Sequence, residues 1–160
     1  MSVEKNPEPR GFWRDLVSTV AFFSPALNPL QRYVGISSKE ILAIIGEEMG
    51  RETSSKFSQL DLKGLLSQMS ETWHILGLGR FEVVGENPLT IRISNCTICG
   101  QIPELGRTFE CSFHEGFIRG LLSHHLRKQV KVRQEGSTEG ESGTWTRTYS
   151  TDISLSPLNL

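Results

Sequence analysis

The sequence predicts an α+β domain, with an antiparallel sheet of two hairpins and helices packed on one face of it. Two patterns lead to this class. Apolar residues recur with a period near 3.6 up to residue 76, and with a period of 2 between residues 81 and 93. Strands do not alternate singly with helices, as they would around a parallel sheet. The predicted order is three helices, a hairpin, a fourth helix and a second hairpin.

The N-terminal part is predicted to hold a tail and two helices. Residues 1–10 are expected to form a flexible tail, and residues 11–160 a single domain with its N-terminal helices in 11–76. A helix over 11–24 presents one broad apolar face and ends before Pro25. Ser37 and Glu40 have the spacing of a capping box, and the helix that they open is expected to end near Gly50.

The third helix has the clearest periodicity. Asp61 is its expected N-cap. Its apolar positions form one continuous stripe along the helix: Leu62, Leu65, Leu66, Met69, Trp73 and Leu76. Gly77 and Gly79 then end it.

The rest of the domain, residues 80–155, is predicted to be hairpin, helix and hairpin. Phe81 and Val83 point to one face of the first hairpin, a turn follows at 85–88, and the second strand buries Leu89, Ile91 and Ile93. The helix over 113–128 places Gly116 and Gly120 on one face, where two small residues permit a close approach by another helix or the sheet. The last hairpin begins near Val130, turns through a mobile polar stretch at 136–143 and returns over 144–155.

Composition and charge exclude several classes of protein. The 160 residues include 17 Lys and Arg against 18 Asp and Glu, so the surplus of positive charge that nucleic acid requires is missing. A content of 37% hydrophobic and 22% charged residues is typical of a soluble globular chain. No apolar run approaches the roughly 20 residues of a membrane span. The N-terminus carries acids and prolines, unlike a signal peptide, so we expect a cytoplasmic protein with reduced thiols.

One set of residues has the spacing of a metal site. Cys96 and Cys99 are followed by Cys111 and His114, which gives Cys-x2-Cys-x11-Cys-x2-His and uses every cysteine of the chain. Two such pairs can complete a tetrahedron around zinc. Four protein ligands would leave no open position, so the predicted zinc ion is structural rather than catalytic.

Other interpretations of these residues stay open. Cys111 is also explained as a buried thiol, Cys96 and Cys99 as a redox pair, and His114 as a helix cap. Other candidates for the fourth ligand are a water molecule and three further histidines: His74, His124 and His125.

Parts of the chain resemble the 4-vinyl-reductase domain family. The similarity covers roughly residues 30–155: the segment Gly77-Leu78-Gly79-Arg80-Phe81-Glu82-Val83, the Cys96/Cys99 pair, the final hairpin and, as its most specific part, Cys111-x-Phe113-x-x-Gly116-Phe117-x-x-Gly120. This family is related in fold to Bet3-type subunits of the TRAPP vesicle-tethering complex and to nitric-oxide sensor domains. The resemblance implies helices on an antiparallel sheet, a small apolar ligand, frequent dimerisation and a metal cluster that includes Cys96, Cys99 and Cys111. This chain departs from the family in its last hairpin, which has no cysteine.

The resemblance favours a non-catalytic domain that binds a small hydrocarbon or lipid-like molecule. The pocket would lie between the helices and the sheet, although each residue of its lining is also explained as plain core. The candidate ligand contacts are Leu66, Trp73, Phe81 and Phe117, with Phe12, Trp13 and Phe22 beside them. The alternative function is homodimeric assembly through the helix over 11–24, whose apolar surface exceeds a single stripe. A reductase is less well supported, because no cofactor motif is visible.

Overall fold

The computed structural model describes residues 38–75, 79–96, 112–140 and 144–155. Within them lie three helices and four strands. The predicted tail over 1–10 and the predicted helix over 11–24 fall outside the described residues. The extent of the domain therefore stays a prediction.

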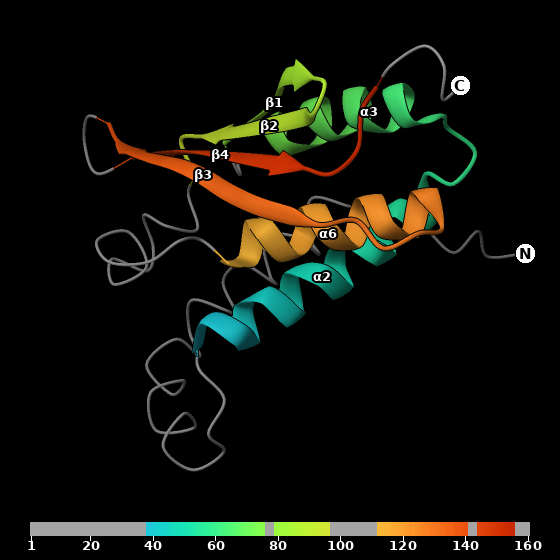
Figure 1. Cartoon of the computed structure of the whole chain (residues 1–160), viewed down its shortest axis with the longest axis horizontal. Helices are drawn as coiled ribbons and strands as arrows, with labels where there is room; N and C mark the ends of the chain where they lie inside the picture. The colour runs from blue at the N-terminus through green and yellow to red at the C-terminus, as the bar shows by residue number, and fades with distance from the viewer. Residues whose placement is uncertain (1–37, 76–78, 97–111, 141–143, 156–160) are drawn as a thin grey trace, which may run out of the picture.

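The four strands form one antiparallel sheet in the order β1-β2-β4-β3 (Figure 1). The strands are β1 (Arg80–Glu86), β2 (Leu89–Ser94), β3 (Val132–Glu139) and β4 (Trp145–Thr151). Each hairpin joins strands that follow one another in the chain, and the two hairpins meet where β2 pairs with β4. The predicted fold class, an α+β domain with a sheet of two hairpins, is confirmed.

The two faces of the sheet differ in polarity. On the inner face Ile93 lies between Phe81 and Arg147 of the neighbouring strands, and Ile91 lies beside Tyr149; all five side chains are buried. On the outer face the alternate positions carry polar side chains, half-buried or exposed: Glu82, Thr90, Arg92, Thr148 and Ser150. The predicted period of 2 in residues 89–93 therefore separates core from solvent.

Helix α3 (Leu62–Ile75) begins and packs as predicted. The Asp61 carboxylate accepts a 2.7 Å hydrogen bond from the backbone N–H of Gly64, which makes Asp61 the N-cap. The apolar stripe of α3 is buried in the core through Leu65, Leu66, Met69 and Trp73.

Helices α2 (Ser38–Lys56) and α6 (Ser112–Leu126) run side by side (Figure 1). Their contact is made by backbone, because four glycines line it. A Cβ atom built on Gly116 would stand 2.1 Å from the Ala43 carbonyl oxygen, and one on Gly120 would stand 2.0 Å from that of Glu47. The close approach predicted for Gly116 and Gly120 is thus confirmed, and the partner is α2.

The structure corrects three local predictions. Helix α2 continues past Gly50 for six residues, because Gly50 packs against α6 instead of ending the helix. Val83 is 39% exposed, since β1 is an edge strand with a register shift between Val83 and Gly85. Residues 136–139, expected in a turn, belong to β3 and pair with β4.

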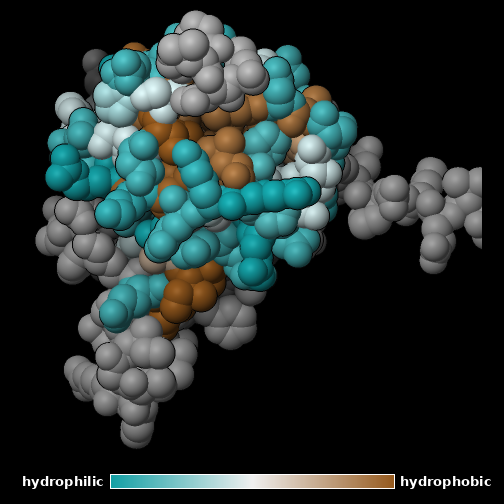
Figure 2. Space-filling view, turned by 45° about the vertical axis from the view of Figure 1, so that its right-hand side comes forward, coloured by the Kyte–Doolittle hydropathy of each residue, from teal (hydrophilic) through white to brown (hydrophobic). Residues whose placement is uncertain are grey.

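The described surface is mainly hydrophilic on the side shown in Figure 2, where hydrophobic side chains emerge in separate areas between long polar ones. Among the helices that the structure describes, none has the length and apolar character needed to cross a membrane.

Candidate functional site

The four predicted ligand contacts come together inside the domain. Trp73 of α3 is at their centre, with ring centroids 5.7 Å from Phe81 of β1 and 4.7 Å from Phe117 of α6. Leu66, two turns before Trp73 on α3, is buried in the same cluster. Their side chains are at most 3% exposed, so helix and sheet enclose them fully.

A buried polar group adjoins this aromatic cluster. His114, in the first turn of α6, is fully buried, with its ring centroid 6.1 Å from that of Trp73. Its Nε2 lies 3.5 Å from Cys96 Sγ and its Nδ1 lies 3.4 Å from the Tyr149 hydroxyl. A neutral imidazole, which donates from one nitrogen and accepts at the other, can serve both neighbours at once.

The chain brings these residues together from distant elements. Cys96 follows the end of β2, where Asn95 takes a left-handed backbone conformation with φ 55°. Tyr149 points inward from β4 because it pairs with Ile91 on the core face. His114 faces the core because it lies on the same side of α6 as Phe117 and Leu121, three and seven residues on.

Two polar atoms at this site have no hydrogen-bond partner among the described residues: Trp73 Nε1 and Ser112 Oγ. Trp73 is 2% exposed and Ser112, two residues before His114, is 3% exposed. Buried donors are rarely left unpaired, because each costs free energy comparable to a lost hydrogen bond. The indole N–H can only donate, so a group that accepts a hydrogen bond would satisfy it.

Two residues of this region were missed at the sequence level, Tyr149 and Arg147. Both are buried on the inner face of β4, and the Arg147 guanidinium lies 5.2 Å from the centre of the Trp145 ring. The signal was present in the alternation of residues 145–151. A tyrosine and an arginine at inward positions are nevertheless less typical of a core than aliphatic residues.

The predicted zinc site is wrong for the part of the chain that the structure describes. No group of three or more His, Cys, Asp or Glu side chains there can hold a metal ion. Of the four predicted ligands, Cys96 and His114 come together, while Cys99 and Cys111 lie outside the described residues. The prediction fails at His114 because its two ring nitrogens face a thiol and a phenol within an aromatic core, and not a set of metal ligands.

The other candidate histidines lie elsewhere. His74 is exposed near the end of α3. His124 Nδ1 is 3.1 Å from the hydroxyl of Ser54 on α2. Burial lowers the pKa of His125, an effect that nearby Asp61 opposes and His124 reinforces. None of the three adjoins the buried group around His114 in the interactions that the structure describes.

No family model matches the sequence. The chain is similar to two uncharacterized proteins of Methanocaldococcus jannaschii. It is 29% identical to MJ1642 over 103 residues, which are 64% of this chain and 58% of that protein. It is 33% identical to MJ0150 over 100 residues, which are 61% of this chain and 56% of that protein. The matched region thus spans less than two thirds of the length of these relatives.

Several solved structures are similar to this chain. The phenol-responsive sensory domain of the transcription activator PoxR, solved with phenol, matches with a TM-score of 0.59 and 11% identity over 82% of this chain and 73% of that one. A structure from a study of H-NOX activation matches with a TM-score of 0.53 and 15% identity. The match covers 94% of this chain and 75% of that one. A vinyl-4-reductase family protein of Methanocaldococcus jannaschii matches with a TM-score of 0.48 and 18% identity. The match covers 93% of this chain and 83% of that one.

These neighbours define the class of the fold. It is an α+β fold shared with a sensory domain and with an H-NOX structure.

Proposed function

We propose that this chain is a small-molecule-binding domain whose ligand contacts the buried site around Trp73 and His114. The single observation that carries the proposal is the Trp73 indole N–H, buried without a described partner beside a fully buried imidazole. Aromatic and aliphatic walls with a few convergent polar groups are typical of small-molecule sites. The PoxR sensory domain, which has the same fold, was solved with phenol.

The proposed ligand is mainly apolar and carries one hydrogen-bond acceptor. Phe81 and Phe117 offer it ring surface, whereas Trp73 offers one donor and His114 one further polar contact. This refines the hydrocarbon or lipid-like ligand that the family resemblance implies, since a pure hydrocarbon would leave the indole N–H unpaired.

We propose binding without chemistry as the role of this site. An imidazole with a thiol 3.5 Å from one ring nitrogen and a phenol 3.4 Å from the other is suited to hold a polar group in place. The sequence shows no nucleotide or redox-cofactor motif beside them, so a reductase remains the weaker interpretation.

Calorimetric titration with phenol and with toluene tests the proposal, because the two rings are similar in size and only phenol has an oxygen. We expect phenol to bind more tightly than toluene, and Trp73→Phe to remove most of that difference while keeping an aromatic ring. His114→Gln should weaken phenol binding, while the matched control His74→Gln, on the exposed end of α3, should bind as the wild type does.

Two results would refute this function. One is the absence of binding for phenol, toluene and the organic compounds extracted from the purified protein and identified by mass spectrometry. The other is equal affinity in the wild type, Trp73→Phe and His114→Gln, which would place any ligand elsewhere.

A further inference from the structure

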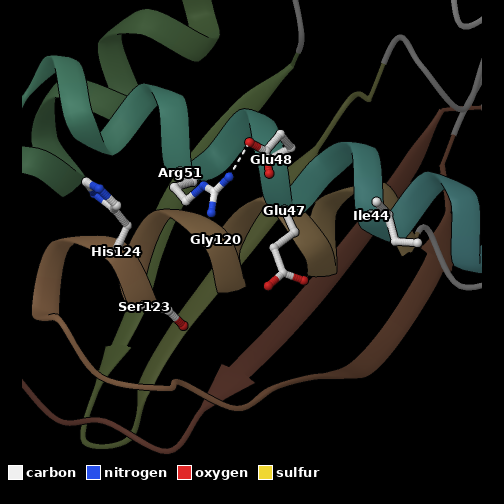
Figure 3. A pocket seen from close by; sticks show the side chains of 7 residues that line it. All are labelled: Ile44, Glu47, Glu48, Arg51, Gly120, Ser123 and His124. Atoms are coloured by element: carbon white, nitrogen blue, oxygen red, sulfur yellow. Dashed lines mark hydrogen bonds and ion pairs between the residues drawn. The ribbon is translucent and has the colours of Figure 1, made fainter.

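Charged side chains on the surface of the helix pair have partners within the chain. In the hollow between α2 and α6 that Figure 3 shows, Glu48 pairs with Arg51, and Glu47 pairs with Arg119 of α6 at 2.9 Å. The charges of this surface hollow are therefore already balanced. A charged side chain inside the domain, Arg147, is in a different position.

Arg147 is buried on the inner face of β4, where it is 1% exposed. Its guanidinium keeps a positive charge at every pH at which proteins are folded. The central carbon of this group lies 5.2 Å from the centre of the half-buried Trp145 ring, a contact typical of a cation over an aromatic face. Burying a charge costs free energy that only polar or charged neighbours offset, so Arg147 is not ordinary core.

One nitrogen of this guanidinium is open to a further contact. Arg147 has other interactions, the Trp145 ring among them, but its Nε is buried and has no hydrogen-bond partner among the described residues. The Nε–H can only donate. It therefore needs an acceptor, as the indole N–H of Trp73 does.

Arg147 lies on the same wall as the proposed ligand site. It is two residues before Tyr149 on β4, so both side chains point to the inner face. Arg147 and Phe81 pair with Ile93 from opposite sides of β2. Because neighbouring strands lie about 5 Å apart, roughly 10 Å separates the backbones of Arg147 and Phe81, whose ring meets Trp73.

The neighbouring strand adds a second polar atom at this end of the site. Gln134 of β3 pairs with Tyr149, and its side-chain oxygen is buried without a partner among the described residues. By turning over, an amide side chain can present either its acceptor or its donor. Gln134 thus favours a polar group here without selecting its charge, whereas Arg147 favours a negative one.

We propose that Arg147 binds an acidic group of the ligand, which makes the ligand an aromatic acid. This role of Arg147 rests on the proposed function and adds a second hydrogen-bond acceptor to its ligand. The first acceptor meets the Trp73 indole N–H, and a carboxylate at the opposite end meets the Arg147 Nε–H. Hydrogen bonds between charged groups are roughly twice as strong as neutral ones, so Arg147 distinguishes an acid from a neutral compound of the same shape.

Calorimetric titration at pH 7.5 with three compounds tests this role. They are phenol, 3-(4-hydroxyphenyl)propionate and the amide of that acid. The acid and the amide have the same shape, but only the acid is charged, since carboxyl groups titrate near pH 4. We expect the wild type to bind the acid at least about tenfold more tightly than the amide.

Variants of two arginines assign this preference to a residue. Arg147→Met keeps a long apolar side chain without the charge, and it should bind the acid and the amide equally. Arg147→Lys should keep a smaller preference for the acid, because lysine retains the charge but not the Nε–H. Arg133→Met is the matched control: the Arg133 side chain is 83% exposed on β3, and the variant should prefer the acid as the wild type does. Circular dichroism verifies that each variant is folded.

Three results would overturn the role of Arg147. A wild type that binds phenol but prefers the amide, or does not distinguish it from the acid, would overturn it and leave the proposed function standing. So would a preference for the acid that survives in folded Arg147→Met. A wild type that binds none of the three compounds would overturn it too and, where toluene and the extracted compounds also fail to bind, the proposed function with it.

Discussion

Gly50 of α2 lies against the backbone of Phe117 in α6: a Cβ atom on Gly50 would stand 2.1 Å from the Phe117 carbonyl oxygen. Glycine inside a helix costs about 1 kcal/mol relative to alanine. Here the cost is offset because the missing side chain lets two helices touch through their backbones. The contact holds α6, and with it His114 and Phe117, in place against the sheet.

The first prediction concerns this crossing. Gly50→Ala should lower the free energy of unfolding by about 2 kcal/mol, because overpacking of a tight contact outweighs the gain in helix propensity. Urea unfolding followed by circular dichroism measures the change. Gly136→Ala is the control, since a Cβ there meets no atom within 4 Å, and it should change stability by less than about 0.5 kcal/mol. A Gly50→Ala variant as stable as the wild type would contradict the close contact.

The second prediction concerns the N-cap of α3. Asp61→Ala should lower the free energy of unfolding by about 1 kcal/mol, because the Gly64 N–H loses its acceptor. Asp61→Asn should retain most of the stability, since asparagine also caps helices well. Equal losses for alanine and asparagine would show that the charge, and not the cap, is what matters.

The third prediction concerns the ion pair between α2 and α6. Arg119 Nε donates a 3.0 Å hydrogen bond to the Glu47 carboxylate, and Glu115 lies 3.6 Å away on the other side. A double-mutant cycle with Arg119→Gln and Glu47→Gln should give a coupling free energy of about 0.5–1 kcal/mol, as for other partly exposed pairs. The coupling should shrink in high salt. A coupling indistinguishable from zero at low salt would show that the pair adds nothing to the contact of the two helices.

The fourth prediction concerns pH. Burial lowers the pKa of His125 in the folded protein, with a smaller opposing effect of Asp61 and a reinforcing effect of His124. The unfolded chain therefore binds a proton more readily, so this residue's contribution to stability is complete above the ordinary pKa near 6.5 and is lost as pH falls through the lowered one. Thermal melting from pH 7.5 down to 5 should fall slightly less in His125→Gln than in the wild type. The same fall in both proteins would contradict the shift.

Local patterns predicted most of the elements. Asp61 opens its helix and the stripe from Leu65 to Trp73 is buried, because capping and helical periodicity involve only residues a few positions apart. The alternation of Leu89, Ile91 and Ile93 likewise assigned a core face to β2, since successive side chains along a strand point to opposite faces of the sheet.

Trp73 lies against both Phe81 and Phe117 in the core, and their role as ligand contacts stays a prediction. His114 was assigned to a metal because the spacing of Cys and His residues shows which side chains can converge, but not what else surrounds them. Its neighbours Tyr149 and Trp73 lie 35 and 41 residues away in the chain.

By itself, the sequence determined the fold class, the positions of most helices and strands, and the aromatic content of the interior. Only the tertiary structure decided that α2 runs through Gly50, that His114 turns inward, and that Arg147 and Tyr149 belong to the inner face. The physical reason is one of range. Periodicity and capping act between near neighbours in the chain, whereas the partner of a glycine or a histidine depends on how distant segments cross in space.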